Sequence, residues 1–249
     1  MNNELKILSD QDVLTTLGAR PRAPYFAMYS SELGGITKDS KWMMIPIDDH
    51  VVHRGDGVFE AIKFLDSRVY GLNEHLSRLE RSSKAIELLN HPTLSEIKNI
   101  ILQTVRASNS PDGLIRLYLT RGTGGFTTNP YDCTQAGLYI VITPFKGMPQ
   151  EKYLTGVSCK ISKYQAKEDF YTQIKSCNYL QNVLMKKDAV DSKVDFTVAI
   201  DSRGFMTEGS TENCAFVNIE GELLIPSFEN TLRGITLLRV IELAQSLVE

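Results

Sequence analysis

Short polar turns between neighbouring apolar strands constrain the fold of this chain more than any other feature. Residues 58–65 and 69–72 have the composition of strands, and only the tripeptide Asp-Ser-Arg at residues 66–68 separates them. A second tight turn at residues 201–204 follows the strand predicted over residues 194–200. Turns this short connect antiparallel strands, whereas parallel strands need a long crossover. The turns therefore favour an α+β fold over a doubly wound parallel sheet.

Helical periodicity and one linker divide the chain. Apolar stripes predict helices over residues 73–89 and 94–108, the first with Asn73 as its N-cap. A strand predicted over residues 138–143 is followed by the proline- and glycine-containing segment 144–149, which is typical of a linker. We therefore expect two α+β domains. Their expected bounds are residues 1–143 for the N-terminal domain, 144–150 for the linker and 151–249 for the C-terminal domain.

Composition excludes several classes of partner. The 249 residues carry a formal net charge of −3, and no lysine or arginine cluster predicts a nucleic-acid surface. No stretch is apolar for long enough to cross a bilayer, and the N-terminus lacks the apolar run of a secretory signal. The four cysteines are widely spaced, so neither a metal site nor a disulfide framework is expected. We expect a cytoplasmic protein with free thiols and a small-molecule ligand.

Two residues mark the ends of the stretch that carries the most chemistry. Lys175 opens the helical pattern that continues over residues 178–191, where an amine can be aimed inward at a ligand. An inward lysine is either paired or functional. A solvated lysine at a helix start is nevertheless the default interpretation for any single lysine of this chain. Glu208 lies at the other end, in the run Met-Thr-Glu-Gly-Ser-Thr-Glu-Asn that begins at residue 206.

Four blocks spread over most of the chain carry a family resemblance. They are Arg-Gly-Asp-Gly-Val-Phe-Glu at residues 54–60, Asn-Glu-His-Leu-Ser-Arg-Leu at 73–79, Lys-Ser-Cys-Asn-Tyr-Leu at 175–180 with Thr-Glu-Gly-Ser-Thr-Glu-Asn at 207–213, and Leu-Arg-Gly-Ile-Thr at 232–236. In this order they resemble the class IV, pyridoxal-phosphate-dependent aminotransferases, which include D-amino-acid and branched-chain aminotransferases and aminodeoxychorismate lyase. The resemblance implies the two-domain α+β fold of fold type IV enzymes. It also implies a pyridoxal 5'-phosphate cofactor and a homodimer in which the partner subunit lends residues to the site.

The resemblance assigns a chemical task to most of these residues. Lys175 is implied as the amine that holds the cofactor aldehyde and moves protons, and Glu208 as the acid beneath the ring nitrogen. Arg78 is expected to grip the phosphate through a bidentate contact, although an arginine on the border of an apolar stripe more often reaches water. The helix start at residues 234–236 offers free N–H groups to the same anion. The implied cofactor-binding set is Arg78, Lys175, Tyr179, Glu208, Ser210, Thr211, Gly234, Ile235 and Thr236.

The residues that would hold the substrate carboxylate depart from the family pattern. Bacterial D-amino-acid aminotransferases resemble this chain at Thr-Arg-Gly-Thr, residues 120–123, but continue with an arginine and a histidine where this chain has glycines. Arg54 is the first candidate, by its position in the sequence, to hold the substrate carboxylate instead, and Arg121 is the second. Tyr179 stands one residue nearer to the candidate lysine than the tyrosine that contacts the ring oxygen in branched-chain relatives. An ordinary core position is therefore equally compatible with Tyr179.

Three functions remain open on this basis. We expect an amino-acid aminotransferase, with D-amino acids among its candidate substrates, that transfers the amino group to a 2-oxo acid. Aminodeoxychorismate lyase, which releases pyruvate and 4-aminobenzoate, is the alternative because the glycine-rich loop at residues 121–125 is similar to the loop of that enzyme. The family usually continues beyond the helix that starts at Gly234, whereas this sequence stops at Glu249. A truncated relative that keeps the fold without catalysis is the third interpretation.

Overall fold

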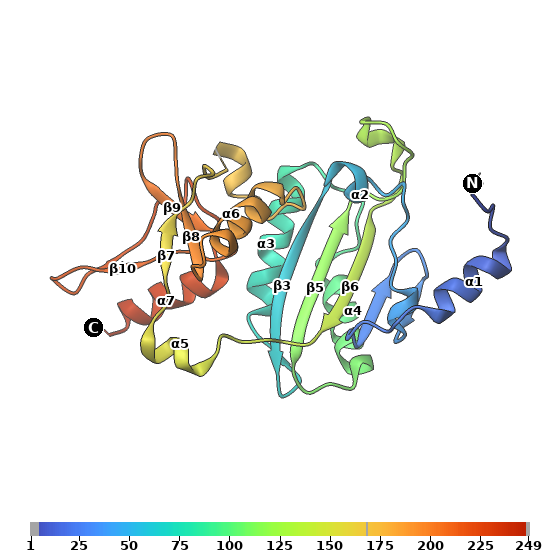
Figure 1. Ribbon diagram of the computed structural model, residues 1–249, viewed down its shortest axis with the longest axis horizontal. Coiled ribbons are helices and arrows are strands. Elements are labelled where there is room, and N and C mark those ends of the chain that lie inside the picture. Colours follow the sequence, from blue (N-terminus) through green and yellow to red (C-terminus); the bar gives the residue numbers. More distant parts are fainter. Residues whose placement is uncertain (1–4, 168, 248–249) are drawn as a thin grey trace.

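An antiparallel six-stranded sheet is the largest element of the fold (Figure 1). The computed structural model describes residues 5–167 and 169–247. The strand order is β2-β1-β6-β5-β3-β4, and every neighbouring pair is antiparallel, in agreement with the α+β prediction. The strands are β1 (Ala27–Ser30), β2 (Gly35–Thr37), β3 (Gly57–Leu65), β4 (Arg68–Val69), β5 (Gly113–Thr120) and β6 (Gly137–Thr143).

Two helices cover one face of this sheet and lie behind it in Figure 1. They are α3 (Leu72–Ala85) and α4 (Leu94–Ser108). Alternation along β5 directs Ile115, Leu117 and Leu119 toward the helices, and all three are fully buried. The opposite face of the same strands carries Phe59 and Tyr118, which are only partly buried. The packed core thus lies on the helix side and leaves the other face open.

The C-terminal part contains a smaller sheet of three strands. Its central strand, β8, pairs in parallel with β7 and antiparallel with β9. The chain reaches this part from β6 through residues 144–149, which form no helix or strand. A division into two domains at this segment stays a prediction. The elements are α5 (Gln150–Thr155), β7 (Cys159–Ile161), η3 (Asp169–Thr172), α6 (Leu180–Asp191), β8 (Phe196–Ile200), β9 (Met206–Gly209), β10 (Phe216–Val217), β11 (Leu223–Leu224) and α7 (Ile235–Gln245).

The bounds of α3 differ from the prediction at both ends. The helix begins at Leu72, and its N-cap is Gly71 in the left-handed conformation, so the predicted cap at Asn73 is wrong. Glycine adopts this conformation without steric cost, and it starts the helix without a side-chain hydrogen bond. The predicted end at residue 89 is also wrong, because the helix stops at Ala85 and Glu87 takes a positive φ of 52°. This turn directs the chain toward α4.

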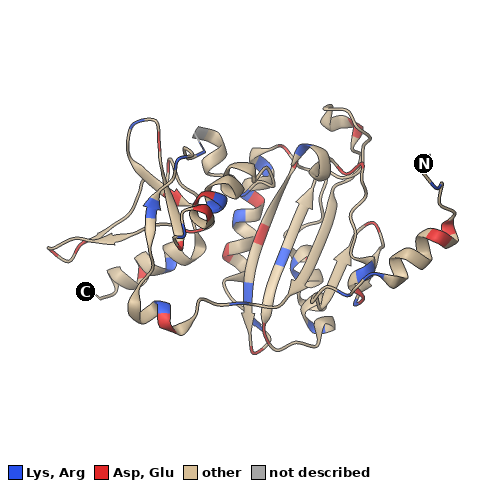
Figure 2. Ribbon diagram, in the orientation of Figure 1, with Lys and Arg blue, Asp and Glu red and all other residues tan. Residues whose placement is uncertain are grey.

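The N-terminal elements lie at the edge of the molecule (Figure 1). They and the remaining short helices are α1 (Asp10–Ala19), η1 (Ser40–Trp42), α2 (His50–Arg54) and η2 (Pro130–Asp132). Figure 2 shows acidic and basic residues interspersed along both parts of the chain. Within residues 5–167 and 169–247, no helix is long and apolar enough to cross a membrane. The same residues contain no group of histidine, cysteine, aspartate or glutamate side chains arranged to hold a metal ion.

Candidate active site

The extended segment before α6 holds Lys175 against the start of β3. The Phe59 N–H donates to the Lys175 carbonyl at 2.9 Å, and the Cys177 N–H donates to the Gly57 carbonyl at 2.8 Å. The Lys175 N–H donates to Ser82 Oγ of α3 at 3.3 Å. Because these bonds tie the segment to the main sheet, Lys175 precedes α6 and does not open it, so that part of the prediction is wrong. The lysine is instead fixed where the two parts of the molecule meet.

The Lys175 side chain extends over the open face of β3. Its Nζ lies 4.6 Å from the centre of the Phe59 ring, a distance at which an ammonium is attracted to an aromatic face. Burial disfavours the charged form and lowers the pKa of the amine to about 8. The positive charge of Arg78 adds to this lowering, whereas Glu60 and Glu208 oppose it. A neutral amine is therefore accessible near physiological pH, as a nucleophile or general base requires.

Glu208, on β9, is held through one of its carboxylate oxygens. Oε2 accepts hydrogen bonds from the Leu232 N–H at 3.0 Å and from Asn213 Nδ2 at 3.3 Å. Burial raises the pKa of this carboxyl to about 7, and the Leu232 hydrogen bond together with the charges of Lys175 and Lys167 limits the rise. The acid is therefore fixed in orientation and titrates near neutral pH.

Arg78 is buried, and one edge of its guanidinium is already occupied. Its Nε donates to Glu60 Oε1 at 2.8 Å, and its Nη2 donates to Glu60 Oε2 at 2.7 Å. Its Nη1 donates to the Arg233 carbonyl at 3.1 Å. A phosphate would therefore meet the remaining N–H groups of Nη1 and Nη2, because Glu60 holds the side formed by Nε and Nη2.

Glu60 and His75 are candidates to which the motifs assigned no role. His75 Nδ1 lies 2.7 Å from Glu60 Oε2, so the two form one buried cluster with Arg78. Burial opposes ionisation of Glu60, but the hydrogen bonds from Arg78 and His75 outweigh it and lower the pKa of the carboxyl. Residues three apart on a helix share a face, so an inward Arg78 implies an inward His75. An inward arginine also requires an acid, which was the available signal for Glu60.

The N-terminus of α7 lies in the same cavity as Lys175 and Arg78. Gly234 is the N-cap, and a Cβ at this position would collide with Asn213 Oδ1. The Leu238 N–H donates to the Gly234 carbonyl at 2.9 Å, so the N–H groups of residues 235–237 have no partner within the helix. Such free groups bind anions. The cavity has a volume of about 500 Å³ and is lined in part by Arg78, Lys175, Thr211, Gly234, Ile235 and Thr236.

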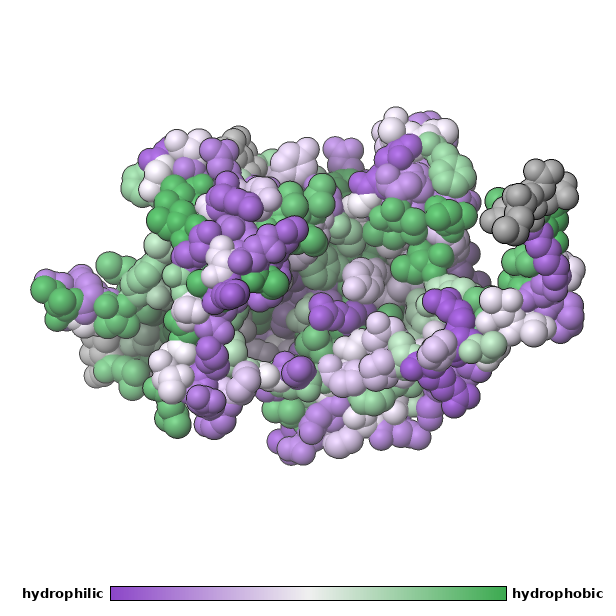
Figure 3. Space-filling model, viewed as in Figure 1, coloured by the Kyte–Doolittle hydropathy of each residue, from purple (hydrophilic) through white to green (hydrophobic). Residues whose placement is uncertain are grey.

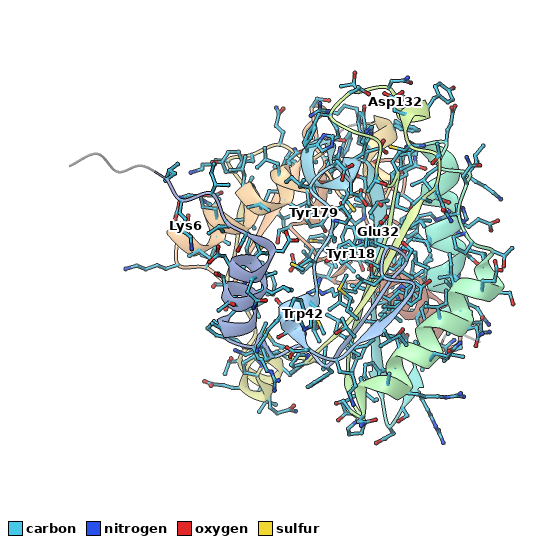
Figure 4. All side chains as sticks on the ribbon, turned by 90° about the vertical axis from the view of Figure 1, so that its right-hand side faces the viewer. Lys6, Glu32, Trp42, Tyr118, Asp132 and Tyr179 are labelled. Carbon is cyan, nitrogen blue, oxygen red and sulfur yellow. The ribbon has the colours of Figure 1, made fainter. Side chains whose placement is uncertain are left out.

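Three aromatic rings line the open side of the site. Phe59 and Tyr118 are cross-strand neighbours whose ring centres are 6.1 Å apart, and Tyr179 packs edge-on against Phe59 at 5.2 Å. Figure 4 labels Tyr118 and Tyr179 on the side of the sheet away from α3 and α4, and Figure 3 shows the molecule hollowed on this face between its two parts. Burial raises the pKa of Tyr179 to about 12, so its hydroxyl stays protonated at neutral pH.

Ser210 and Thr211 both contact Glu212. Ser210 Oγ donates to Glu212 Oε2 at 3.3 Å, and the Thr211 N–H donates to the same oxygen at 2.9 Å. The Ser210 carbonyl accepts a hydrogen bond from Asn182 Nδ2 at 2.7 Å, and Ser210 is buried. Thr211 is exposed and lines the Lys175 cavity. Contact with a ligand therefore fits the placement of Thr211 better than that of Ser210.

The two arginines expected to bind substrate lie elsewhere. Among the described residues, those that line the Lys175 cavity do not include Arg54 or Arg121. Arg121 donates to the two oxygens of Asp56 at 2.9 and 3.0 Å and to two backbone carbonyls of the segment after α3. Arg54 is exposed and donates to the Phe126 carbonyl at 2.7 Å, which ties it to the glycine-rich loop. Their contact with substrate stays a prediction.

Comparison with known proteins places this site in a family of cofactor-dependent enzymes. The profile of the family described as Amino-transferase class IV matches residues 57–249, so the chain belongs to the class IV aminotransferases. The chain is 37% identical over 233 residues to the chloroplastic D-amino-acid transaminase of Arabidopsis thaliana. This match covers 92% of the chain and 61% of the relative, so the chain spans about three fifths of that protein's length.

Solved structures show the same fold. The crystal structure of the Escherichia coli branched-chain amino acid aminotransferase matches with a TM-score of 0.81 at 26% identity, over 90% of this chain and 75% of that one. The 4-amino-4-deoxychorismate lyase of Pseudomonas aeruginosa matches with a TM-score of 0.73 at 21% identity, over 82% of this chain and 74% of the lyase. The second likeness concerns the fold alone. The predicted fold type IV architecture is confirmed.

Proposed function

We propose that this protein is a pyridoxal-phosphate-dependent aminotransferase that acts on amino acids, including D-amino acids, and passes the amino group to a 2-oxo acid. The observation that carries the proposal is the cavity shared by the Lys175 amine and the first turn of α7. Glu208 supports it, because its carboxylate is close enough to oppose the lowered pKa of Lys175. The Arabidopsis relative, named a D-amino-acid transaminase, supports the substrate class.

Side chains in and beside the cavity suit pyridoxal phosphate at both ends of that molecule, and the described residues that line the cavity include neither Glu208 nor Tyr179. Arg78 and the free N–H groups of residues 235–237 offer positive charge and donors to a phosphate. Glu208 offers a carboxylate to the ring nitrogen, and Tyr179 keeps a hydroxyl that can donate to the ring oxygen. At Gly234, where a Cβ would collide with Asn213, the backbone itself forms the phosphate end of the cavity.

Each residue then has a distinct part in the reaction. When bound, the cofactor supplies an aldehyde that takes up amines and a ring that withdraws electrons from the α-carbon of the substrate. The Lys175 amine would hold the cofactor through its aldehyde, and as a free base it would accept the α-proton of the substrate and donate a proton at the second reacting carbon. Glu208 in its carboxylate form keeps the ring nitrogen protonated. Arg78 and α7 fix the phosphate and thereby the orientation of the ring.

A cytoplasmic homodimer is part of the proposal. Among the described residues that line the cavity, the cations are Arg78 and Lys175, and the cofactor would engage both of them. Arg54 is exposed and donates to the Phe126 carbonyl next to the glycine-rich loop. We expect it to bind the substrate carboxylate in the site of the other subunit of the dimer. All four cysteines are free thiols, which fits a reducing compartment.

Cofactor attachment is the first test of this function. Protein supplied with pyridoxal phosphate should absorb visible light, and borohydride should then attach the cofactor irreversibly to Lys175, which peptide mass spectrometry locates. Lys175→Ala should abolish attachment, whereas the same change at the exposed Lys163 should not. A colourless protein that takes up no cofactor would favour the non-catalytic relative.

The substrate is tested separately from the cofactor. D- and L-amino acids are supplied with pyruvate or 2-oxoglutarate, and aminodeoxychorismate is supplied alone. A keto acid formed only in the presence of an acceptor supports the aminotransferase. Release of pyruvate and 4-aminobenzoate without any acceptor would replace it with the lyase.

A further inference from the structure

Lys167 is a half-buried lysine that the proposed chemistry does not use. It lies in the segment between β7 and η3, and its Nζ stands 5.0 Å from the centre of the Tyr179 ring. Among the side chains that the structure describes, which do not include those of residues 168 and 169, none accepts a hydrogen bond from this ammonium or forms an ion pair with it. Burial lowers the pKa of this amine, and the charge of Glu208 is the first to oppose the lowering. Removing an ammonium from water costs free energy, and the charge of Glu208 offsets part of that cost.

Lys167 and Glu208 line the same small polar cavity. Its volume is about 10 Å³, near the smallest that holds one water. Asn182 lines it too, and Asn182 Oδ1 is buried without a partner in the described part of the chain. Water in so small a space screens the charges that border it less than bulk solvent does, and the charge of Lys167 lowers the pKa of Glu208. The field of Lys167 therefore reaches the Glu208 carboxylate.

The other ionisable groups near Glu208 are less able to keep it charged. Lys175 is taken up by the cofactor, and the guanidinium of Arg78 is paired with Glu60. Tyr179 has its pKa raised to about 12 by burial, so it is neutral at physiological pH. Cys214, whose pKa burial raises to about 11, is neutral as well. Lys167 is the third cation that opposes protonation of Glu208, and no carboxylate described by the structure forms an ion pair with it.

We propose that Lys167 is a positioning residue, whose charge across the shared cavity keeps Glu208 in its carboxylate form and so acts on the cofactor ring through Glu208. The proposal rests on the proposed function of Glu208. Both hydrogen bonds to that carboxylate end on Oε2, and Oε1 accepts none from the described residues. Oε1 thus remains for the ring nitrogen, and Lys167 has no need to contact the cofactor.

The test follows the titration of Glu208 in the full-length chain without cofactor. Glutamate labelled with ¹³C at its carboxyl carbon gives one signal per side chain, and the Glu208 signal is the one that Glu208→Gln removes. Lys167→Met should raise the apparent pKa of Glu208 by about 1, the lower end of the effect of a nearby opposite charge. Lys167→Arg, which keeps the charge, should restore the wild-type value.

Lys163→Met is the matched control, since Lys163 lies four residues away on the same segment, is exposed and stands 4.0 Å from Asp188. It should leave the titration of Glu208 unchanged. In the loaded enzyme, Lys167→Met should lower turnover about fivefold at pH 7 and hardly at all near pH 9, where a carboxyl of either pKa is ionised.

An unchanged Glu208 titration in Lys167→Met would overturn the proposal, whatever the turnover. If that variant does not fold, as judged by circular dichroism, Lys167→Gln provides the same comparison with a polar side chain. A wild-type chain that shows no aminotransferase activity would contradict the proposed function. The titration would still decide whether Lys167 controls the charge of Glu208.

Discussion

Lys175 and Glu208 are two partly buried ionisable groups, and burial brings their pKa values closer together. That of Lys175 is lowered to about 8, and that of Glu208 is raised to about 7. In both cases burial is the largest cause, because it disfavours whichever form carries the charge. Groups that are fully charged in water at pH 7 therefore become able to exchange protons in this site. This is the property that reversible proton transfer at an α-carbon needs.

The rate of cofactor uptake should report the pKa of Lys175. Only the neutral amine attacks an aldehyde, so the rate should rise about tenfold per pH unit below pH 8 and level off above it. An unperturbed lysine would keep gaining rate up to about pH 10. Stopped-flow absorbance, with cofactor-free protein mixed with pyridoxal phosphate at each pH, measures this profile. A rate that still climbs beyond pH 9 would show that burial does not control the amine.

Glu208→Gln should stabilise the cofactor-free protein at high pH. The folded pKa of about 7 exceeds the ordinary 4.5, so the stability contributed by the protonated acid is complete below pH 4.5 and is lost as pH rises through 7. Ionisation of the buried carboxyl then costs up to about 3 kcal/mol, which glutamine avoids. Urea unfolding should show a difference of about 3 kcal/mol between variant and wild type at pH 8.5 that falls to about 1 kcal/mol at pH 5.

The exposed Glu220 provides the control for this change. Glu220→Gln removes the same charge from a solvated site, so the free energy of unfolding should stay close to that of wild type at both pH values. A Glu208→Gln variant with the same stability difference at pH 5 and pH 8.5 would contradict the raised pKa.

At the scale of elements, the N–H groups at the start of α7 are proposed to supply part of the binding site for the phosphate. Gly234→Ala places a Cβ against Asn213, which also donates to the Leu232 carbonyl at 2.9 Å and to Glu208 at 3.3 Å. The backbone must move to relieve the collision, and we expect a loss of about 1–3 kcal/mol in stability. The Kd for pyridoxal phosphate should rise about tenfold, or ~1.4 kcal/mol, in absorbance titrations.

Gly18→Ala is the control for the glycine change, because no atom lies within 4 Å of a Cβ at this position in α1. It should leave cofactor affinity close to that of wild type and raise stability by up to about 1 kcal/mol, because alanine favours the helix more than glycine does. A folded Gly234→Ala protein that binds the cofactor as tightly as wild type would exclude α7 from the phosphate grip.

Elements with purely local signals were predictable from the sequence. The helix predicted over residues 94–108 has the observed bounds, and the strand predicted over residues 58–65 is observed one residue longer, over Gly57–Leu65, since a capping box and alternation are encoded within these segments. The start of α3 was not predictable from Asn73, because a left-handed Gly71 precedes the helix. The extended backbone at Lys175 was missed because its hydrogen bonds go to β3, far earlier in the chain.

The site residues that belong to a sequence motif were predictable. The residues that pair with them in the folded protein were not. The motifs brought Lys175, Arg78 and the start of α7 into consideration, and the structure places these three in one cavity. They did not reveal that Glu60 occupies one edge of Arg78, because that pair joins a strand to a helix. Nor did they reveal that Asp56 accepts hydrogen bonds from Arg121, one of the two arginines predicted to bind substrate. Such pairings depend on tertiary structure.

At the scale of the whole molecule, the two parts are stabilised unequally. The core cluster of the N-terminal part draws side chains from α3, α4 and the long strands of the main sheet. The cluster of the C-terminal part contains Ala166, Met185 and Ala199, with Tyr164 packed against it. Because apolar burial is the main source of stability, the C-terminal part has less of its own. The active site therefore joins a well-packed region to a weakly packed one.

Amide hydrogen exchange should resolve this difference and test the predicted domain boundary at residues 144–150. Without cofactor, amides of β3, β5 and β6 should exchange only through global unfolding, whereas those of β8 and α6 should exchange through smaller openings. Pyridoxal phosphate at 100 times its Kd stabilises the states that bind it by about 2.7 kcal/mol. It should therefore slow exchange most at residues 174–177 and 206–209. Mass spectrometry of exchange with and without cofactor measures both effects. Uniform exchange across the two parts, unaltered by cofactor, would contradict the unequal cores and the two-domain division together.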